Sequence, residues 1–190
     1  MKIIDISKHN GIIDFDKVKA SGKVDGVMIR SSWGHFREDE QFKRNVSECE
    51  RLNIPYGFYH YSYACNYSEM VEEAKELINL IKNYKPLLPV AIDMEDADGY
   101  KSKMGTLNNI TLNTEICRYT CAELEKAGFY AMVYANLDWT KTKLNMSMLS
   151  SYDLWLARWG ANAPSRKCGM WQYTNSASVN GIASRVDMSK

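Results

Sequence analysis

The stretch LLPVAIDMEDADG, residues 87–99, puts four carboxyl side chains directly after a short apolar run. An apolar run of this length, with proline before it and glycine after it, is typical of a strand that is buried on both faces and ends in a loop. Residues i and i+2 of a strand share a face, so Asp93 and Glu95 point the same way, while Ile92 and Met94 point toward a helical layer. Carboxyl groups at the mouth of a buried strand are costly, which predicts a use for them.

Seven more short apolar or β-branched runs bring the number of predicted strands to eight. Helical segments separate the first five strands, and in 66–84 apolar residues follow helical spacing behind an Asn66 cap. Segments 39–53 and 112–128 have the same character, and after Asn136 only 146–153 leaves room for helical turns. The predicted strands cover residues 2–7, 25–32, 54–64, 88–95, 129–136, 154–159, 169–174 and 184–189.

Strands that alternate with helices indicate a parallel sheet. The predicted fold class is therefore α/β: an irregular TIM-like barrel of five β/α units followed by three strands with little or no intervening helix. The functional groups of such barrels lie at the C-terminal ends of the strands. Acidic residues lie at or near these ends in strand 1 (Asp5), strand 4 (Asp93 and Glu95) and strand 8 (Asp187). Closure of the barrel makes strands 1 and 8 neighbours, so we expect the four acids to meet.

More than one chemistry fits four clustered carboxyl groups. They can push their pKa values apart so that one stays protonated, as glycosidic cleavage requires. They could instead hold Mg²⁺ in a phosphodiesterase, or act only as caps and loop ligands of water. The scattered His9, His35 and His60, and five cysteines without C-x-x-C spacing, favour no other metal site. We therefore expect no metal and no cofactor.

Aromatic residues on the predicted strands favour a sugar ligand, because pyranose faces stack on their rings. Arg30 is too polar for a buried strand unless it meets a carboxylate or a substrate, so we expect it in the cavity. The net charge of +1 and the scattered basic residues argue against nucleic acid, and no apolar run is long enough for a membrane helix. The candidate substrate-binding residues are Arg30, Tyr59, Tyr61, Tyr134, Trp155 and Trp171.

Six segments resemble, in order and over nearly the whole chain, glycoside hydrolase family 25. These are the lysozymes, or N-acetylmuramidases, of many phage endolysins and bacterial autolysins. The resemblance implies an irregular β/α barrel and cleavage of the β-1,4 bond between N-acetylmuramic acid and N-acetylglucosamine in peptidoglycan. The segments are IIDISKHNG (3–11), PYGFYHY (55–61), AIDMED (91–96), LWLARW (154–159), MWQYT (170–174) and VNGIASRVDMS (179–189).

The resemblance also implies roles for the four acids. Glu95 becomes the general acid/base and Asp93 assists it, either as the nucleophile or, preferably, by orienting the substrate's own N-acetyl group for its attack on the anomeric carbon. Both routes retain the anomeric configuration. Asp5 and Asp187 would shape the field that keeps Glu95 protonated. The rival interpretations are a metal-dependent phosphodiesterase barrel and a non-catalytic glycan-binding barrel.

The expected organisation is a single catalytic domain, residues 1–190, without the wall-binding repeats that family members commonly carry. The N-terminal MKIIDISKHNG contains too short an apolar run for a secretory signal. We therefore expect synthesis in the cytoplasm and, for a phage endolysin, release to the wall through a holin-type pore. The expected partner is the glycan of bacterial peptidoglycan, without nucleic acid or membrane insertion, and a monomer is the default.

Overall fold

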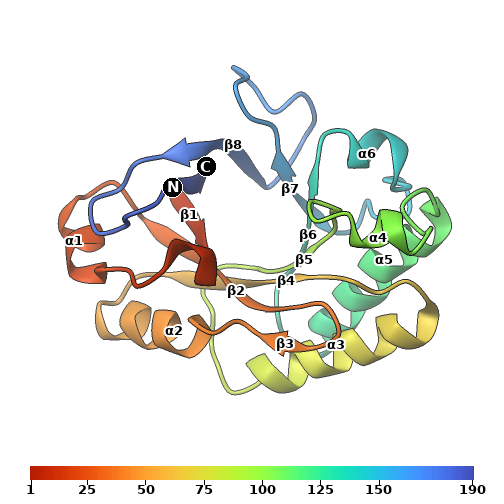
Figure 1. The fold of residues 1–190 in the computed structure, drawn as a ribbon, viewed down its shortest axis with the longest axis horizontal. Helices are drawn as coiled ribbons and strands as arrows, with labels where there is room; N and C mark the ends of the chain where they lie inside the picture. Colours follow the sequence, from red (N-terminus) through yellow and green to blue (C-terminus); the bar gives the residue numbers. More distant parts are fainter.

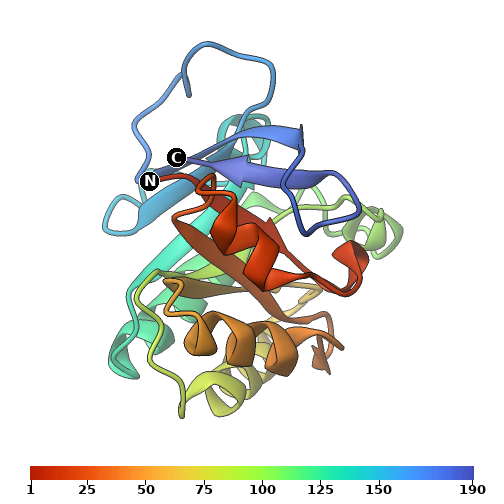
Figure 2. The same cartoon turned by 90° about the vertical axis from the view of Figure 1, so that its left-hand side faces the viewer.

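Eight strands close into a barrel in the computed structural model, which describes residues 1–190 (Figure 1). The order around the barrel is β1 (Ile3–Ile6), β2 (Gly26–Trp33), β4 (Tyr56–Tyr61), β5 (Val90–Asp93), β6 (Ala131–Asn136), β7 (Asp153–Ala157), β8 (Met170–Ala177) and β9 (Val186–Ser189). The short β3 (Arg37–Glu38) pairs with the outer end of β2. All eight predicted strands are confirmed, and the chain termini lie side by side because β1 pairs with β9 (Figures 1 and 2).

The helices lie unevenly around the barrel. Figure 1 shows α2, α3 and α5 along one side, whereas β8 and the connection before it carry no helix. Asn66 caps α3 by accepting a hydrogen bond from the Glu69 backbone N–H, as predicted. The helices are α1 (Phe15–Ala20), α2 (Phe42–Arg51), α3 (Tyr67–Ile81), α4 (Tyr100–Lys103), α5 (Ile110–Lys126) and α6 (Trp139–Thr142), and η1 (Lys8–Asn10) is a 3₁₀ turn. None of them is long and apolar enough to cross a membrane.

Two sequence-based expectations about the last third of the chain need correction. The helical turn expected at 146–153 is instead α6 at Trp139–Thr142, and residues 146–151 form turns. The last strand, β9, runs antiparallel to both β8 and β1. A connection of eight residues, 178–185, is too short for the crossover that a parallel strand needs. Asp187 therefore lies near the start of its strand, and the reversal of β9 brings that start to the mouth of the barrel.

The core has two parts, which follow from the alternation of side chains along the strands. A small cluster that includes Met28, Ala91, Met132 and Trp155 fills the barrel below the mouth. A much larger cluster, which includes Ile92, lies between the strands and the helices. Neighbouring residues of β5 thus face opposite layers, as the two-residue period predicts. The filled interior leaves only the mouth of the barrel open for a ligand.

Candidate active site

A cavity of about 630 Å³ opens at the C-terminal ends of the parallel strands. Strand order gathers residues there from both ends of the chain, because β1 lies between β2 and β9. Five carboxyl groups line the cavity: Asp5, Asp93, Glu95, Asp98 and Asp187. A part of a cavity that holds this many acids is suited to proton transfer rather than to binding an anion.

Two pairs of acids are placed by strand geometry. Asp5 of β1 lies directly opposite Asp187 of β9 in the antiparallel register. Asp93 is the last residue of β5, and Glu95 follows it by two residues on the way into the loop. Asp93 is buried, and its Oδ1 has no hydrogen-bond partner in the protein. An orphaned buried carboxyl oxygen that faces a cavity is free to accept a hydrogen bond from a ligand.

Gln172 of β8 holds the Asp5–Asp187 pair from inside the barrel. Its Nε2 donates to Asp5 Oδ2 at 3.0 Å and to Asp187 Oδ2 at 3.4 Å. Its Oε1 accepts hydrogen bonds from the Tyr134 hydroxyl at 3.2 Å and from Trp159 Nε1 at 2.9 Å. Gln172 is only 1% exposed, so these contacts fix its amide in one orientation. Sequence analysis missed Gln172. The available signal was a polar residue inside an apolar strand, the same signal that pointed to Arg30.

The electrostatics of the site favour protonated carboxyl groups. Burial, followed by the negative charges of Asp187, Asp98 and Asp96, raises the pKa of Glu95 to about 7. Burial and the neighbouring Glu95 and Asp5 raise the pKa of Asp93. Burial raises the pKa of Asp5 as well, and the negative charge of Asp187 raises it further. Burial also raises the pKa of Asp187. The site thus keeps protons near neutral pH that isolated carboxyl groups would have lost.

Asp98 behaves differently from the other acids of the cavity. Burial raises its pKa, but hydrogen bonds from the Tyr63 hydroxyl, the Tyr100 backbone and the Tyr61 hydroxyl bring the pKa below its usual value. Asp98 therefore stays ionised beside Glu95. Its fixed negative charge is one of the causes of the raised Glu95 pKa.

No three His, Cys, Asp or Glu side chains of the chain are grouped as the ligands of a metal ion would be. The five cysteines are all free thiols, and three of them are buried.

Comparison with known proteins assigns the family. The sequence model of the glycosyl hydrolases family 25 matches residues 4–182. The chain belongs to this family. The resemblance seen in the six segments is thereby confirmed, together with the irregular TIM-like barrel that it implied.

Several relatives in the family can be aligned over almost all of this chain. The autolytic lysozyme of Clostridium acetobutylicum is 30% identical over 190 residues, which are 99% of this chain and 55% of that protein. The modular autolysin LytC from Streptococcus pneumoniae, solved in complex with a synthetic peptidoglycan ligand, is 34% identical with a TM-score of 0.87, over 99% of this chain and 46% of that one. The CTP1L endolysin is 26% identical with a TM-score of 0.82, over 100% of this chain and 65% of that one. The chain thus spans about half to two thirds of the length of these relatives.

The predicted substrate-binding residues of this family 25 chain divide into three groups: residues of the main cavity, a residue of an adjoining hollow, and residues that line neither. Arg30, Tyr59 and Tyr61 line the main cavity. Tyr134 lines an adjoining hollow of about 280 Å³, which it shares with Glu95 and with the half-exposed Trp159. The hollow extends the cavity past Glu95, so a ligand longer than one ring could lie on both sides of that carboxyl group.

Trp155 and Trp171 line neither cavity, and this placement removes them from the candidate substrate contacts. Trp155 points into the barrel but lies below the mouth, where it is 1% exposed and its Nε1 donates to Ser189 Oγ at 2.9 Å. Trp171 alternates with Gln172 and so faces away from the barrel interior, where its Nε1 donates to the Arg158 carbonyl oxygen at 2.9 Å. Depth along β7 and the alternation of side chains along β8 explain why neither tryptophan lines a cavity.

The cavity is also lined by basic side chains that sequence analysis did not select. Lys8 and His9 come from η1, directly after β1, and Arg185 precedes β9. Trp33, at the end of β2, and Tyr63 are two large aromatic side chains of the cavity that were missed as well. The segment SKHN did stand inside one of the family-like motifs, directly after a strand that carries a candidate acid, and this position was the available signal.

Proposed function

We propose that this chain is a peptidoglycan hydrolase, an N-acetylmuramidase that cleaves the β-1,4 bond between N-acetylmuramic acid and N-acetylglucosamine. Membership of family 25 and the lysozymes among its relatives support the class of enzyme. The observation that carries the assignment is Glu95, a carboxyl group with a pKa of about 7 that lies two residues after Asp93 at an open cavity. Glycosidic cleavage needs such a pair, one acid and one anion.

Glu95 acts as the general acid in this proposal. With a pKa of about 7 it is protonated in a large part of the molecules at neutral pH. It donates this proton to the glycosidic oxygen as the bond to the anomeric carbon breaks. The resulting carboxylate then takes a proton from the water molecule that completes hydrolysis, which returns Glu95 to its starting state.

Asp93 stabilises the positive charge that forms on the sugar. Its unpartnered Oδ1 is placed to accept a hydrogen bond from the N–H of the substrate's acetamido group. This contact orients the acetamido carbonyl oxygen, which attacks the anomeric carbon from the face opposite to Glu95. The developing positive charge favours the ionised form of Asp93 although burial disfavours it. Attack by the substrate and a second attack by water together retain the anomeric configuration.

Asp5 and Asp187 tune the field and contact substrate hydroxyl groups. Gln172 holds them together, and the charge of Asp187 is the strongest effect on the Glu95 pKa after burial. The aromatic contacts in this proposal are Tyr59, Tyr61 and Tyr134. The place of action is the bacterial cell wall, in line with an autolysin and an endolysin among the relatives, while the domain organisation and the route of release stay predictions.

The products of digestion test this proposal directly. Purified peptidoglycan is digested with the protein in excess EDTA, the new reducing ends are converted to alditols with borohydride, and these are identified by mass spectrometry. We expect muramitol ends. Glucosaminitol ends would mean a glucosaminidase on the same barrel, and digestion that occurs only without EDTA would favour a metal-dependent enzyme. Binding to peptidoglycan without any new ends would leave a glycan-binding barrel.

A further inference from the structure

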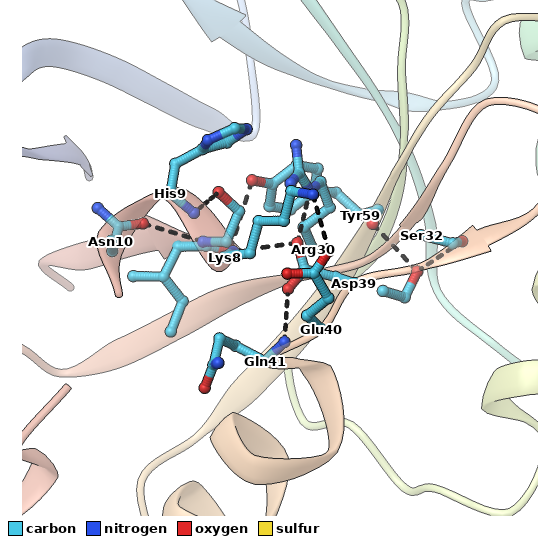
Figure 3. Close-up of polar contacts among 12 residues, drawn as sticks. Lys8, His9, Asn10, Arg30, Ser32, Asp39, Glu40, Gln41 and Tyr59 are labelled. Atoms are coloured by element: carbon cyan, nitrogen blue, oxygen red, sulfur yellow. Dashed lines mark hydrogen bonds and ion pairs between the residues drawn. The ribbon is translucent and has the colours of Figure 1, made fainter. Parts of the chain in front are cut away.

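The cavity is lined by basic side chains as well as by acids. The acids lie on β1, β5 and β9 and in the loop after β5, and the part of the lining that contains Lys8, Arg30 and Arg185, with His9 beside them, is here called the cationic wall. Figure 3 shows Lys8, His9 and Arg30 close together, with Asp39 and Tyr59 beside them. The mechanism proposed above uses none of these cations. A charged wall that faces a ligand cavity and takes no part in proton transfer is a candidate for substrate recognition.

Arg30 is the centre of the cationic wall. It is 7% exposed, and its only hydrogen bond joins Nε to Asp39 Oδ2 at 2.8 Å. The Asp39 carboxylate also accepts hydrogen bonds from the backbone N–H groups of Lys8, at 3.0 Å, and Gln41, at 2.9 Å. Asp39 therefore holds the guanidinium group at Nε, neither Nη atom donates a hydrogen bond within the protein, and Nη2 is a buried atom without a partner. An arginine stays charged at any working pH, and its free N–H groups suit the two oxygens of a carboxylate.

A bulge in β2 brings a tryptophan to the same wall. The pairing of β2 with β4 shifts by one residue between Arg30 and Ser32, so that both Arg30 and Trp33 face the cavity although they are three residues apart. The Arg30 guanidinium carbon lies 4.9 Å from the centre of the Trp33 ring, and Lys8 Nζ lies 4.4 Å from it. The ring thus holds two cations next to each other.

The other groups of this wall leave its positive charge available. Lys8 Nζ pairs with Glu40, whose side chain is 69% exposed, and a pair so open to water is weak and easily exchanged. Burial, Arg30 and Lys8 together lower the pKa of His9, against opposing effects of Asp39 and Glu40. Of the acids near this wall, Asp39 is occupied by Arg30 and two backbone N–H groups, and Glu40 points to solvent.

We propose that Arg30 and Lys8, with Arg185 at the rim, form a subsite for a carboxylate on the muramic acid side chain of the substrate. This inference rests on the proposed function and names a further feature of its substrate. The sugar rings of the glycan are neutral. The strand carries a carboxylate on the lactyl group of muramic acid where no peptide is attached, and on the peptide where one is attached. The two sources share one chemistry, and the substrate is then recognised by its negative charge as well as by its rings.

Three forms of one soluble glycan fragment separate these sources. The first carries its peptides, the second has lost them and keeps the free lactyl carboxylate, and the third has every carboxyl group converted to a neutral methylamide. Dissociation constants are measured with Glu95→Gln, which does not turn the ligand over, and kcat/KM is measured with the wild type. We expect the methylamide to bind about 10- to 100-fold more weakly than the better of the two anionic forms. The better anionic form identifies the source of the carboxylate.

Two variants assign the effect to the cationic wall. Lys8→Gln should reduce the preference for the anionic forms over the methylamide, mainly through KM. Lys43→Gln is the matched control, because Lys43 also pairs with a surface glutamate, Glu38, but lies outside the cavity. Arg30→Lys keeps a positive charge opposite the buried Asp39 but loses the planar guanidinium group. It therefore tests Arg30 without leaving the Asp39 carboxylate unpaired.

The outcomes separate the subsite from the proposed reaction. Equal binding and equal kcat/KM for all three fragments would overturn the subsite while leaving the hydrolase in place. An equal loss for all three fragments in Lys8→Gln would also overturn it. A preference for anionic fragments in the binding assay, without cleavage by the wild type, would support the subsite and reject the proposed reaction.

Discussion

Glu95 and Glu73 are two glutamates that the fold shields from water to different degrees: Glu95 is partly buried at the cavity, and Glu73 lies on the buried face of α3. Glu73 is 4% exposed and accepts hydrogen bonds from Ser62 Oγ at 2.6 Å and the Tyr63 backbone N–H at 3.0 Å, with His60 Nε2 at 3.3 Å. Burial raises its pKa, but the contacts with His60 and Ser62 bring it below the ordinary value. Glu95 has burial and three negative neighbours, and its pKa rises to about 7.

The difference shows that burial alone does not make a carboxyl group an acid catalyst. Glu73 is surrounded by donors, so its ionised form is stabilised and the residue joins β4 to α3 as a structural anion. Glu95 is surrounded by acceptors, so its neutral form is stabilised and it can give up a proton during a reaction. The partner groups, which come from distant parts of the chain, set the role.

The largest expected effect comes from removing the acid. Glu95→Gln keeps the size of the side chain and loses the proton, so hydrolysis of peptidoglycan should fall by about 10² to 10⁴-fold or more. Asp93→Asn should be similarly damaging. The measurement is the initial rate of release of reducing ends, with the melting temperature as the control for folding. A rate close to that of the wild type in Glu95→Gln would place the acid elsewhere.

Removing the structural anion should act on stability instead. Glu73→Ala leaves the Ser62 hydroxyl, the Tyr63 N–H and His60 without their acceptor, and we expect a loss of about 3 kcal/mol in the free energy of unfolding. Urea denaturation measures this loss. Glu72→Ala, at the exposed neighbouring position, should change stability by less than about 0.5 kcal/mol. Equal effects at the two positions would show that the buried network contributes little.

A smaller effect is expected from Asp187→Asn, which removes one negative neighbour of Glu95. The pKa of Glu95 should fall, since the charge of Asp187 is the largest effect that raises it after burial. The alkaline limb of the pH profile of kcat/KM should then move to lower pH by about half to one unit. An unchanged limb would argue against the proposed tuning by Asp187.

A further expected effect is a pH dependence of stability with opposite signs for the two glutamates. The pKa of Glu95 is raised from 4.5 to about 7 by folding, so its contribution lowers stability as the pH rises through this window, and Glu95→Gln should be more stable than the wild type at pH 8 but not at pH 4. The pKa of Glu73 is lowered, so its contribution is present above about 4.5 and is lost as the pH falls. Urea titrations at the two pH values compare the variants, and the same sign for both would contradict the comparison.

Local patterns along the chain were sufficient to predict the eight strands, the long helices and the shared face of Asp93 and Glu95. These features depend on a period of two or 3.6 residues and on caps such as Asn66, all of which lie within a few residues of one another. The family-like segments added the barrel type, which the family match confirms.

Contacts between distant segments account for what the sequence could not show. Asp187 faces Asp5 because β9 is reversed, and Gln172 holds both because β8 lies next to β9. Trp155 lies too deep in the barrel to contact a substrate, a depth that depends on strand tilt and register rather than on residue type. The pKa of Glu95 and the free guanidinium edge of Arg30 likewise depend on which groups the closed barrel brings within a few ångströms, since electrostatic effects act through space and not along the chain.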